Sequence, residues 1–322
     1  MPLNGLTVDV EDWIQSVFDS SASLTDNFRD NTNRVLEAFA ARGVQATFFV
    51  LGLAANKAPD LVRAIHAAGH EVQSHGYGHC PVHTLTPRQF REDLRASKGL
   101  LEDLIGHSIV GYRAPAFSIT FRNLWAFDVL AECGFTYDSS VYPVKTRRYG
   151  IASAPRFPHR VRTSQSILLE LPVATYRCSG RTLPLGGGGY FRLFPYPMMR
   201  RTVSQINDEG YSATIYLHPY EYNPTELAQL STRIPRRLHI HQTLGRRGVP
   251  AKLDRLLVDF RFAPLQVVIA SLSAIPIHDY LITEAPSSKS DDAFTLVPMG
   301  ASHPGNVPPT SHEKRPKGKV RT

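Results

Sequence analysis

Short apolar runs alternate with amphipathic stretches along most of this chain. The apolar runs are the expected strands, and they are LTVDV (6–10), ATFFVLG (46–52), HEVQS (70–74), IVGYR (109–113), FTYDSS (135–140), SILLELPV (166–173) and SATIYLHP (212–219). Strands that alternate with helices favour an α/β fold with a mainly parallel sheet, either open or rolled into a barrel.

The stretches between these runs carry helix start and stop signals. Thr86 is followed by Pro87 and Gln89, which is the pattern of a capping box with proline at the first helical position. This pattern predicts a helix over 87–106. Further helices are expected over 57–68 and 123–133, each followed by a glycine, and over 198–208.

Composition limits the classes of protein to consider. The chain has 322 residues, of which 42% are hydrophobic, enough for one large α/β domain or two modest ones. The formal charge is +8, but the last ten residues hold five Lys or Arg and one Glu. The folded part is therefore only mildly basic, and no nucleic-acid partner is expected. Residues 286–322 mix Ser, Pro, Gly and Lys without periodicity and are expected to form a disordered basic tail.

The cysteine content and the N-terminal sequence indicate the cellular compartment in which the protein is expected. Three cysteines at no familiar spacing argue against a disulfide framework. The N-terminal stretch lacks the features of a secretory signal, and no apolar run is long enough to span a membrane. We therefore expect a cytoplasmic protein, free or peripheral to the inner membrane, without a transmembrane segment.

Polar side chains of types that can act in catalysis or bind metals follow several of the expected strands. The carboxyl ends of parallel strands share one face, so these residues are expected to converge there. They are Asp9 and Glu11 after the first strand, His75 and His79 after the third, Arg113 after the fourth, and His218 after the last.

Two imidazoles and a carboxylate form a ligand set for a catalytic divalent metal, with a position left for water. A second carboxylate nearby could take a proton from that water. Asp9 and Glu11 are two residues apart on a strand and point to the same side. This favours Asp9 as the base and Glu11 as the ligand, while Asp12 remains a competing ligand.

Five stretches of the chain carry a resemblance to a known family. TVDVED, SHGYGH, GYRAPAFSIT, LPLGGGGYFRLFPY and YLHPYEYNP resemble, in order, the motifs of NodB-type polysaccharide deacetylases, which are carbohydrate esterase family four. The branch found with exosortase and exopolysaccharide gene clusters is the most similar. The resemblance covers 6–269 and includes LLVDFRFAPLQVVI, which is similar to that branch's C-terminal extension.

The resemblance implies a distorted (β/α) barrel of about seven mainly parallel strands. It also implies a single domain over 1–285, with a helical extension from about residue 235, followed by the tail over 286–322.

Site residues can be carried over where the motifs match. The implied roles are Asp9 as general base, Glu11 or Asp12 with His75 and His79 as metal ligands, Arg113 as the group that orients the base, and His218 as general acid. Pro115, Tyr190 and Phe191 are candidate substrate contacts. The fourth motif has a glycine run and Tyr190 in place of the family's Asp and Trp, so the group that tunes His218 is open.

The implied activity is metal-dependent hydrolysis of N-acetyl groups on a polysaccharide or oligosaccharide precursor, releasing acetate. The expected cofactor is one divalent ion, zinc first, with cobalt or nickel as alternatives. The expected partners are an N-acetylated glycan and a polysaccharide synthesis machinery. Two alternatives stay open: an allantoinase-like amidohydrolase acting on a small cyclic amide, and an inactive glycan-binding module.

Other residues receive weaker expectations. His83 and Cys80 follow His79 closely, but Pro81 interrupts a helix, so neither is expected to bind the metal. The glycine run 186–189 lacks the Lys-Ser/Thr ending of a phosphate loop and is expected to shape a sugar groove. Trp125 is a further candidate for stacking on sugar, and Glu221 is a candidate hydrogen-bond partner near His218.

Overall fold

The first expected strand lies inside the sheet of the computed structural model, which describes residues 2–146, 149–230 and 233–280. Strand β1 (Asn4–Val10) is buried along its whole length. It pairs in parallel with β2 (Thr47–Val50) on one side and with β10 (Thr214–Leu217) on the other. A strand flanked on both sides and buried on both faces needs the apolar sequence that this segment has.

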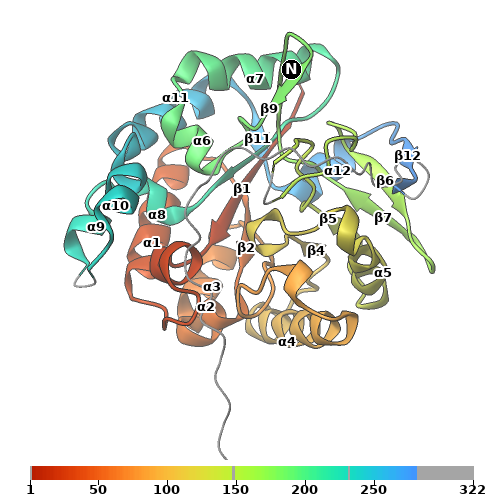
Figure 1. Ribbon diagram of the computed structural model, residues 1–322, viewed down its shortest axis with the longest axis horizontal. Helices are drawn as coiled ribbons and strands as arrows, with labels where there is room; N and C mark the ends of the chain where they lie inside the picture. Colours follow the sequence, from red (N-terminus) through yellow and green to blue (C-terminus); the bar gives the residue numbers. More distant parts are fainter. Residues whose placement is uncertain (1, 147–148, 231–232, 281–322) are drawn as a thin grey trace, which may run out of the picture. The chain divides into compact units, whose positions relative to one another are not determined.

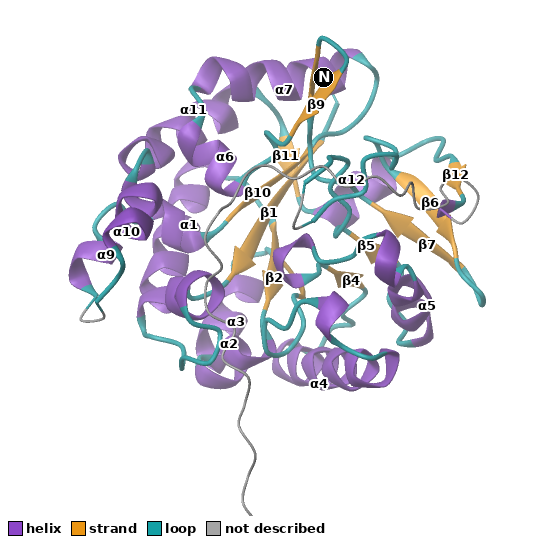
Figure 2. Ribbon diagram, in the orientation of Figure 1, coloured by secondary structure: helices purple, strands orange, loops and turns teal. Residues whose placement is uncertain are grey.

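The sheet contains all seven expected strands. Its order is β10, β1, β2, β3 (Glu71–Ser74), β4 (Gly111–Tyr112), β5 (Tyr137–Asp138), β7 (Ile167–Glu170), β6 (His159–Arg162) and β12 (Ile277–His278), and β11 (Phe262–Ala263) also pairs with β1. Every pairing is parallel except that of β6 with β7. The expectation of a mainly parallel α/β sheet is confirmed (Figure 2).

The remaining strands were not predicted from the sequence, because most of them are too short to show an alternation of apolar and polar residues. β11 and β12 have two residues each, and β6 alternates buried and exposed residues over only four. A separate two-stranded ribbon pairs β8 (Tyr176–Cys178) with β9 (Arg181–Leu183).

The ring of strands is completed by irregular backbone rather than by a ladder. After β7, the Leu171 N–H donates to the Asp138 carbonyl at 2.8 Å, and the Ala174 N–H donates to the Thr214 carbonyl of β10 at 2.9 Å. Segment 171–174 therefore links β5 to β10, which is the feature of a distorted barrel.

Helices cover the outside of the sheet (Figure 1). Those in the first part of the chain are α1 (Asn27–Arg42), α2 (Gly52–Lys57), α3 (Pro59–Ala67), α4 (Pro87–Ile105) and α5 (Trp125–Glu132). The capping box at the start of α4 is present: Thr86 Oγ1 accepts from the Gln89 N–H, and Gln89 Oε1 accepts from the Thr86 N–H. The expected helices therefore occur within a few residues of their predicted limits, while α1 was not predicted.

The C-terminal half is richer in helix. Its helices are α6 (Gly188–Leu193), α7 (Tyr196–Asp208), α8 (Pro219–Tyr222), α9 (Glu226–Gln229), α10 (Arg236–Thr243), α11 (Val249–Asp259) and α12 (Leu265–Ser271). The stretch after residue 235 contains α10, α11 and α12, and its strand β11 pairs with β1. This extension therefore adds a short strand to the main sheet.

The described residues belong to one compact unit. The predicted tail over 286–322 lies outside the described residues. In the part of the chain that the structure describes, no helix has the length and apolarity needed to cross a membrane.

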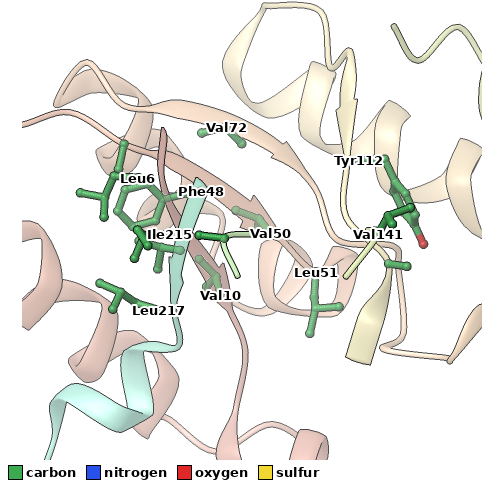
Figure 3. Close-up of a cluster of buried hydrophobic side chains, with 14 of the residues drawn as sticks. Leu6, Val10, Phe48, Val50, Leu51, Val72, Tyr112, Val141, Ile215 and Leu217 are labelled. Carbon is green, nitrogen blue, oxygen red and sulfur yellow. The ribbon is translucent and has the colours of Figure 1, made fainter. Parts of the chain in front are cut away.

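The main core lies where β1, β2 and β10 meet the surrounding helices. Figure 3 shows side chains of these three strands gathered together, among them Leu6, Phe48 and Ile215. All three are fully buried. Because this core fixes three neighbouring strands in register, it also fixes the positions of their carboxyl ends.

One buried histidine in this core makes stability depend on pH. His70 packs against the rings of Phe39 and Phe48, and its Nδ1 accepts from the Ala46 N–H at 3.2 Å. Burial lowers the pKa of His70 from 6.5 to about 4. As the pH falls through this window, the unfolded chain binds a proton that the folded chain does not, so stability is lost.

We predict that His70→Asn, which keeps an acceptor for Ala46 but does not titrate, removes this loss. Relative to the variant, the wild type should lose about 2 kcal/mol of unfolding free energy between about pH 7.5 and pH 5. Urea denaturation of both proteins at the two pH values measures the difference. A difference that does not change with pH would contradict the assignment.

Candidate active site

Three parallel strands of the sheet deliver the candidate site residues to one place. Asp9 is on β1 with Glu11 just after it, His75 directly follows β3, and His218 directly follows β10. His79 lies four residues beyond His75, on the same loop. The predicted convergence at the carboxyl ends of the strands is therefore observed.

Glu11, His75 and His79 offer three ligand atoms that face one another. Glu11 Oε1 lies 2.9 Å from His75 Nε2 and 3.2 Å from His79 Nε2. His75 Nδ1 lies 2.8 Å from the Arg113 carbonyl and donates to it, so Nε2 is the atom that would bind a metal once it has lost its proton. Two imidazole nitrogens and one carboxylate oxygen at this spacing fit a divalent ion that keeps an open position.

The loop that carries the two histidines is shaped by its backbone. Gly76 has φ +77°, and a Cβ there would lie 2.9 Å from Asp93 Oδ2. The same Asp93 oxygen accepts from the Tyr77 N–H at 2.9 Å. Asp93 therefore anchors the loop between His75 and His79, a role that nothing in the local sequence announced.

The charge of Glu11 is stabilised by the imidazoles around it. Burial on its own would raise the pKa of Glu11. The charges of His79 and His218 and hydrogen bonds from His75 and His79 act in the opposite direction. The pKa of Glu11 is held well below its usual value, so this carboxylate is ionised at neutral pH.

Asp12, the competing ligand, does not join this group. Its Oδ1 accepts from the Ile14 N–H at 2.9 Å, and its Oδ2 accepts from the N–H and hydroxyl of Thr25. Both oxygens are thus engaged by the turn that follows β1. The sequence could not separate Asp12 from Glu11, because the point where the chain leaves the strand direction decides which carboxylate faces the histidines.

Asp9 is held by Arg113 in a buried ion pair. Arg113 NH1 donates to Asp9 Oδ1 at 2.8 Å and to Thr7 Oγ1 at 2.7 Å. The rest of the guanidinium donates to the carbonyl and hydroxyl oxygens of Ser139. Asp9 Oδ2 remains directed at His218 Nε2, 3.9 Å away. Arg113 therefore orients Asp9, and one carboxylate oxygen is left for chemistry.

His218 has an acidic partner on its other nitrogen. Glu221 Oε2 lies 3.4 Å from His218 Nδ1, and Glu221 Oε1 lies 3.6 Å from Nε of the buried Arg192. Arg192 also donates to the carbonyls of His241 and Leu244, at the end of α10. The motif LPLGGGGYFRLFPY (183–196) thus influences His218 indirectly, because its Arg192 contacts Glu221, which contacts His218.

The pKa of His218 is raised to about 9 in the metal-free protein. Burial acts to lower it, but Glu11, Glu221 and Asp9 together raise it further than burial lowers it. The imidazole is also stacked on the ring of Tyr220, at 4.8 Å between centroids. These carboxylates therefore favour the charged imidazole, and His218 Nε2 lies beside Asp9.

A cavity of about 150 Å³ opens onto these groups. It is lined by Asp9, Glu11, Ser16, Val17, His79, Ala114, Ala116, Phe117, Tyr149, Tyr216, His218 and Tyr220. Sequence reasoning missed its apolar wall. Tyr216 and Tyr220 lie beside His218 inside the last motif and could have been found from it, whereas Tyr149 lies far from any motif.

None of the three predicted substrate contacts lines this cavity. Pro115 is buried, and Phe191 belongs to the hydrophobic core, with 1% of its surface exposed. Neither side chain is therefore part of the cavity wall. Tyr190 reaches the cavity only through Tyr149, because their hydroxyls are 3.0 Å apart.

The glycine run 186–189 packs against β10 rather than lining the cavity. A Cβ on Gly187 would lie 2.1 Å from the Tyr216 carbonyl, and one on Gly188 would lie 2.5 Å from the Tyr216 hydroxyl. Glycine is therefore required at these positions by close approach. Its effect on the site is to hold Tyr216 in the cavity wall.

Two family models match adjoining parts of the chain. Residues 10–137 match a model described as polysaccharide deacetylase, and residues 139–270 match a domain of unknown function, DUF3473. The expected resemblance to polysaccharide deacetylases is confirmed for this domain. The exosortase-associated branch stays a prediction.

Curated relatives match about a third of the chain. A peptidoglycan deacetylase of Helicobacter pylori is 34% identical over 108 residues, which are 34% of this chain and 36% of that protein. A chitooligosaccharide deacetylase of Sinorhizobium fredii is 34% identical over 100 residues, which are 31% of this chain and 44% of that protein. The chain thus spans less than half the length of these relatives.

Solved structures support the fold. A crystal structure from Mycobacterium smegmatis assigned to the polysaccharide deacetylases has a TM-score of 0.57 at 20% identity, covering 89% of this chain and 99% of that one. An allantoinase has a TM-score of 0.53 at 16% identity, covering 87% and 88%. At these identities the likeness concerns the fold alone.

We predict that the imidazole of His218 in the metal-free protein titrates near pH 9, because three carboxylates surround it. Removing one of them with Glu221→Gln should lower the midpoint by about one pH unit. An NMR titration of the histidine resonances measures both values, and His218→Gln assigns the signal. A wild-type midpoint at or below the ordinary histidine value would contradict the geometry described here.

Proposed function

We propose that this chain, which carries a polysaccharide deacetylase domain over residues 10–137, hydrolyses the N-acetyl amide bond of an acetamido sugar in a glycan and releases acetate. One observation carries the proposal. Two members of a three-ligand group (Glu11 and His79), the Asp9 carboxylate held by a buried arginine, and His218 all line the same small cavity.

Glu11, His75 and His79 would hold the ion, because their three ligand atoms meet at one point. Imidazole and carboxylate ligands with an open position suit zinc, and cobalt and nickel share this preference. The ion would supply Lewis-acid polarisation of the acetyl carbonyl and of a water molecule.

The protein's own groups would move the protons. Asp9 Oδ2, left unpaired by Arg113, accepts a proton as water adds to the acetyl carbon. Arg113 keeps this carboxylate in place through the turnover. His218 then gives its Nε2 proton to the sugar nitrogen as the C–N bond breaks, and Glu221 stabilises the imidazole while it is charged. The products are acetate and a free amino sugar.

The separation of Asp9 and His218 suits this exchange. Asp9 Oδ2 and His218 Nε2 are 3.9 Å apart, so both can approach a reacting centre that lies beside them. The base comes from β1, and the acid follows β10. One group can therefore accept a proton and the other donate one at the same reacting centre.

The class of substrate follows from the relatives, which act on peptidoglycan and chitooligosaccharides according to their names. We infer an N-acetylated glycan for this chain too. An exopolysaccharide precursor and a synthesis machinery as partner stay predictions that rest on the sequence resemblance. Cys80, Cys133 and Cys178 are free thiols, which supports a reducing compartment such as the cytoplasm.

The two alternatives make different demands on the site. The allantoinase likeness concerns a shared fold and does not select a cyclic amide as substrate. An inactive glycan-binding module has no use for an oriented carboxylate, a histidine beside it and a three-ligand group at one site. The geometry therefore favours the deacetylase.

We predict that zinc binding separates Glu11 from Asp12. Wild type should bind about one equivalent of zinc, and Glu11→Gln and His75→Ala should lose it, because each removes one of only three ligands. Asp12→Asn should keep the metal and lose stability, because it weakens the turn bound to Ile14 and Thr25. Metal analysis after dialysis checks this. Loss of zinc in Asp12→Asn with retention in Glu11→Gln would reverse the assignment.

We predict that Asp9→Asn and His218→Gln each lower turnover of zinc-loaded enzyme by about 10² to 10⁴-fold while leaving the fold intact. Acetate release from N-acetylglucosamine oligomers measures turnover, and circular dichroism reports the fold. Asp103→Asn and His107→Gln, at exposed positions away from the cavity, are matched controls. Wild-type turnover in either test variant would remove the role proposed for that residue, and no acetate from wild type with any of the three metals would overturn the activity.

A further inference from the structure

A second and larger groove adjoins the reactive cavity. Its volume is about 480 Å³, and it is lined by His83, Leu85, Thr120, Phe121, Arg122, Asn123, Trp125, Thr146, Tyr149 and Gly150. Tyr149 lines both spaces. The proposed mechanism uses none of the other residues that line this groove.

The reactive cavity is too small to hold an oligosaccharide by itself. Its volume of about 150 Å³ is below the range of about 300 to 1,000 Å³ typical of ligand sites. It suits an acetamido group, so the rest of the glycan must lie outside. The second groove has a volume within that range and shares a wall with the first.

Hydrogen bonds fix one wall of the groove. Asn123 is buried, and its amide accepts from the backbone and hydroxyl of Thr120 and donates to the Ser118 carbonyl at 3.0 Å. Ser118 Oγ accepts from the Val82 N–H at 2.9 Å, which joins this wall to the turn that carries His83. Both the oxygen and the nitrogen of the Asn123 amide thus have partners within this wall, and the side chains beside it provide the ligand contacts.

Those side chains combine aromatic surface with positive charge. Trp125 packs edge-on against the buried Phe90 and still lines the groove. Arg122 is exposed, and within the described residues its guanidinium makes no ion pair or hydrogen bond. None of the residues that line the groove is acidic. An unpaired guanidinium beside an indole ring fits a sugar ring that carries a carboxylate.

We propose that this groove binds the sugar next to the reacting N-acetyl sugar, and that this neighbour is acidic, with its carboxylate bound by Arg122. The substrate class is then an acidic glycan in which acetamido sugars adjoin uronic acid residues. Tyr149 separates the two sugars, and its contact with Tyr190 holds it there. This inference rests on the proposed deacetylation and extends it to substrate choice.

The first test is kinetic. Zinc-loaded full-length enzyme is assayed for acetate release from neutral N-acetylglucosamine oligomers and from oligomers that alternate N-acetylglucosamine with glucuronic acid. We expect a lower KM for the acidic oligomers. Arg122→Gln should raise the KM for the acidic oligomers about tenfold with kcat unchanged, and it should leave the KM for the neutral oligomers unchanged. Arg122→Lys should restore part of the affinity for the acidic oligomers, because it keeps the positive charge but not the paired N–H donors of the guanidinium. Arg201→Gln, an exposed arginine on α7 outside both cavities, is the matched control.

The second test does not depend on catalysis. Calorimetry measures binding of a galacturonic acid tetramer, which has no acetamido group, against a neutral galactose tetramer. We expect binding of the acidic tetramer only, weakened about tenfold in Arg122→Gln and unchanged in Arg201→Gln.

The two tests separate the two proposals. Binding of the acidic tetramer that depends on Arg122, without acetate release from any oligomer, would support the groove and overturn the deacetylase. Acetate release with the same KM for both kinds of oligomer in wild type and Arg122→Gln would support the deacetylase and overturn the groove. Absence of binding together with absence of any Arg122 effect would also overturn it.

Discussion

The buried guanidinium of Arg113 joins the strands on which the candidate site depends. Its side chain binds Thr7 and Asp9 on β1 and Ser139 after β5, and its carbonyl accepts from His75 after β3. It thus positions the proposed base and one proposed ligand at once. A charge buried this deeply is tolerated only when its donors are satisfied, and removing one partner of such a pair costs about 3 to 5 kcal/mol. The same contacts therefore serve folding and chemistry.

The candidate site is divided between the two matched parts of the chain. Glu11, His75, His79 and Arg113 lie within residues 10–137, whereas His218 and its partners lie within residues 139–270. Arg192 reaches from Glu221 to carbonyls at the end of α10, and Arg246 (also buried) donates to the Tyr220 carbonyl and to Glu226. Two buried arginines thus fix the loop that carries His218 against the C-terminal extension. This gives the domain of unknown function a structural part in the site, since it supplies and holds the proposed acid.

Prediction from the sequence worked where the information was local. The strand pattern, the capping box at Thr86 and the polar residues placed just after strands are all written in short stretches, and each was found where expected. Prediction did not work where the answer depended on residues far away. Phe191 was expected to touch substrate because it sits in a motif, but the packing of α6 directs it into the core. The helix α1 carries many polar residues, and it is held in place by packing against α8 and by Phe39, which contacts Phe48 of β2.

The sequence by itself determined the parallel α/β architecture and the set of side chains at the ends of β1, β3 and β10, because hydrophobic periodicity and strand direction are local properties. Only the tertiary structure decided that Glu11 rather than Asp12 faces the histidines, that Glu221 lies between His218 and Arg192, and that Tyr149 lines two adjoining cavities. Each of these depends on where the chain turns after an element and on which distant segment then packs beside it. The distances between such side chains are set by the packing of the whole core, and the spacing of residues along the sequence does not predict them.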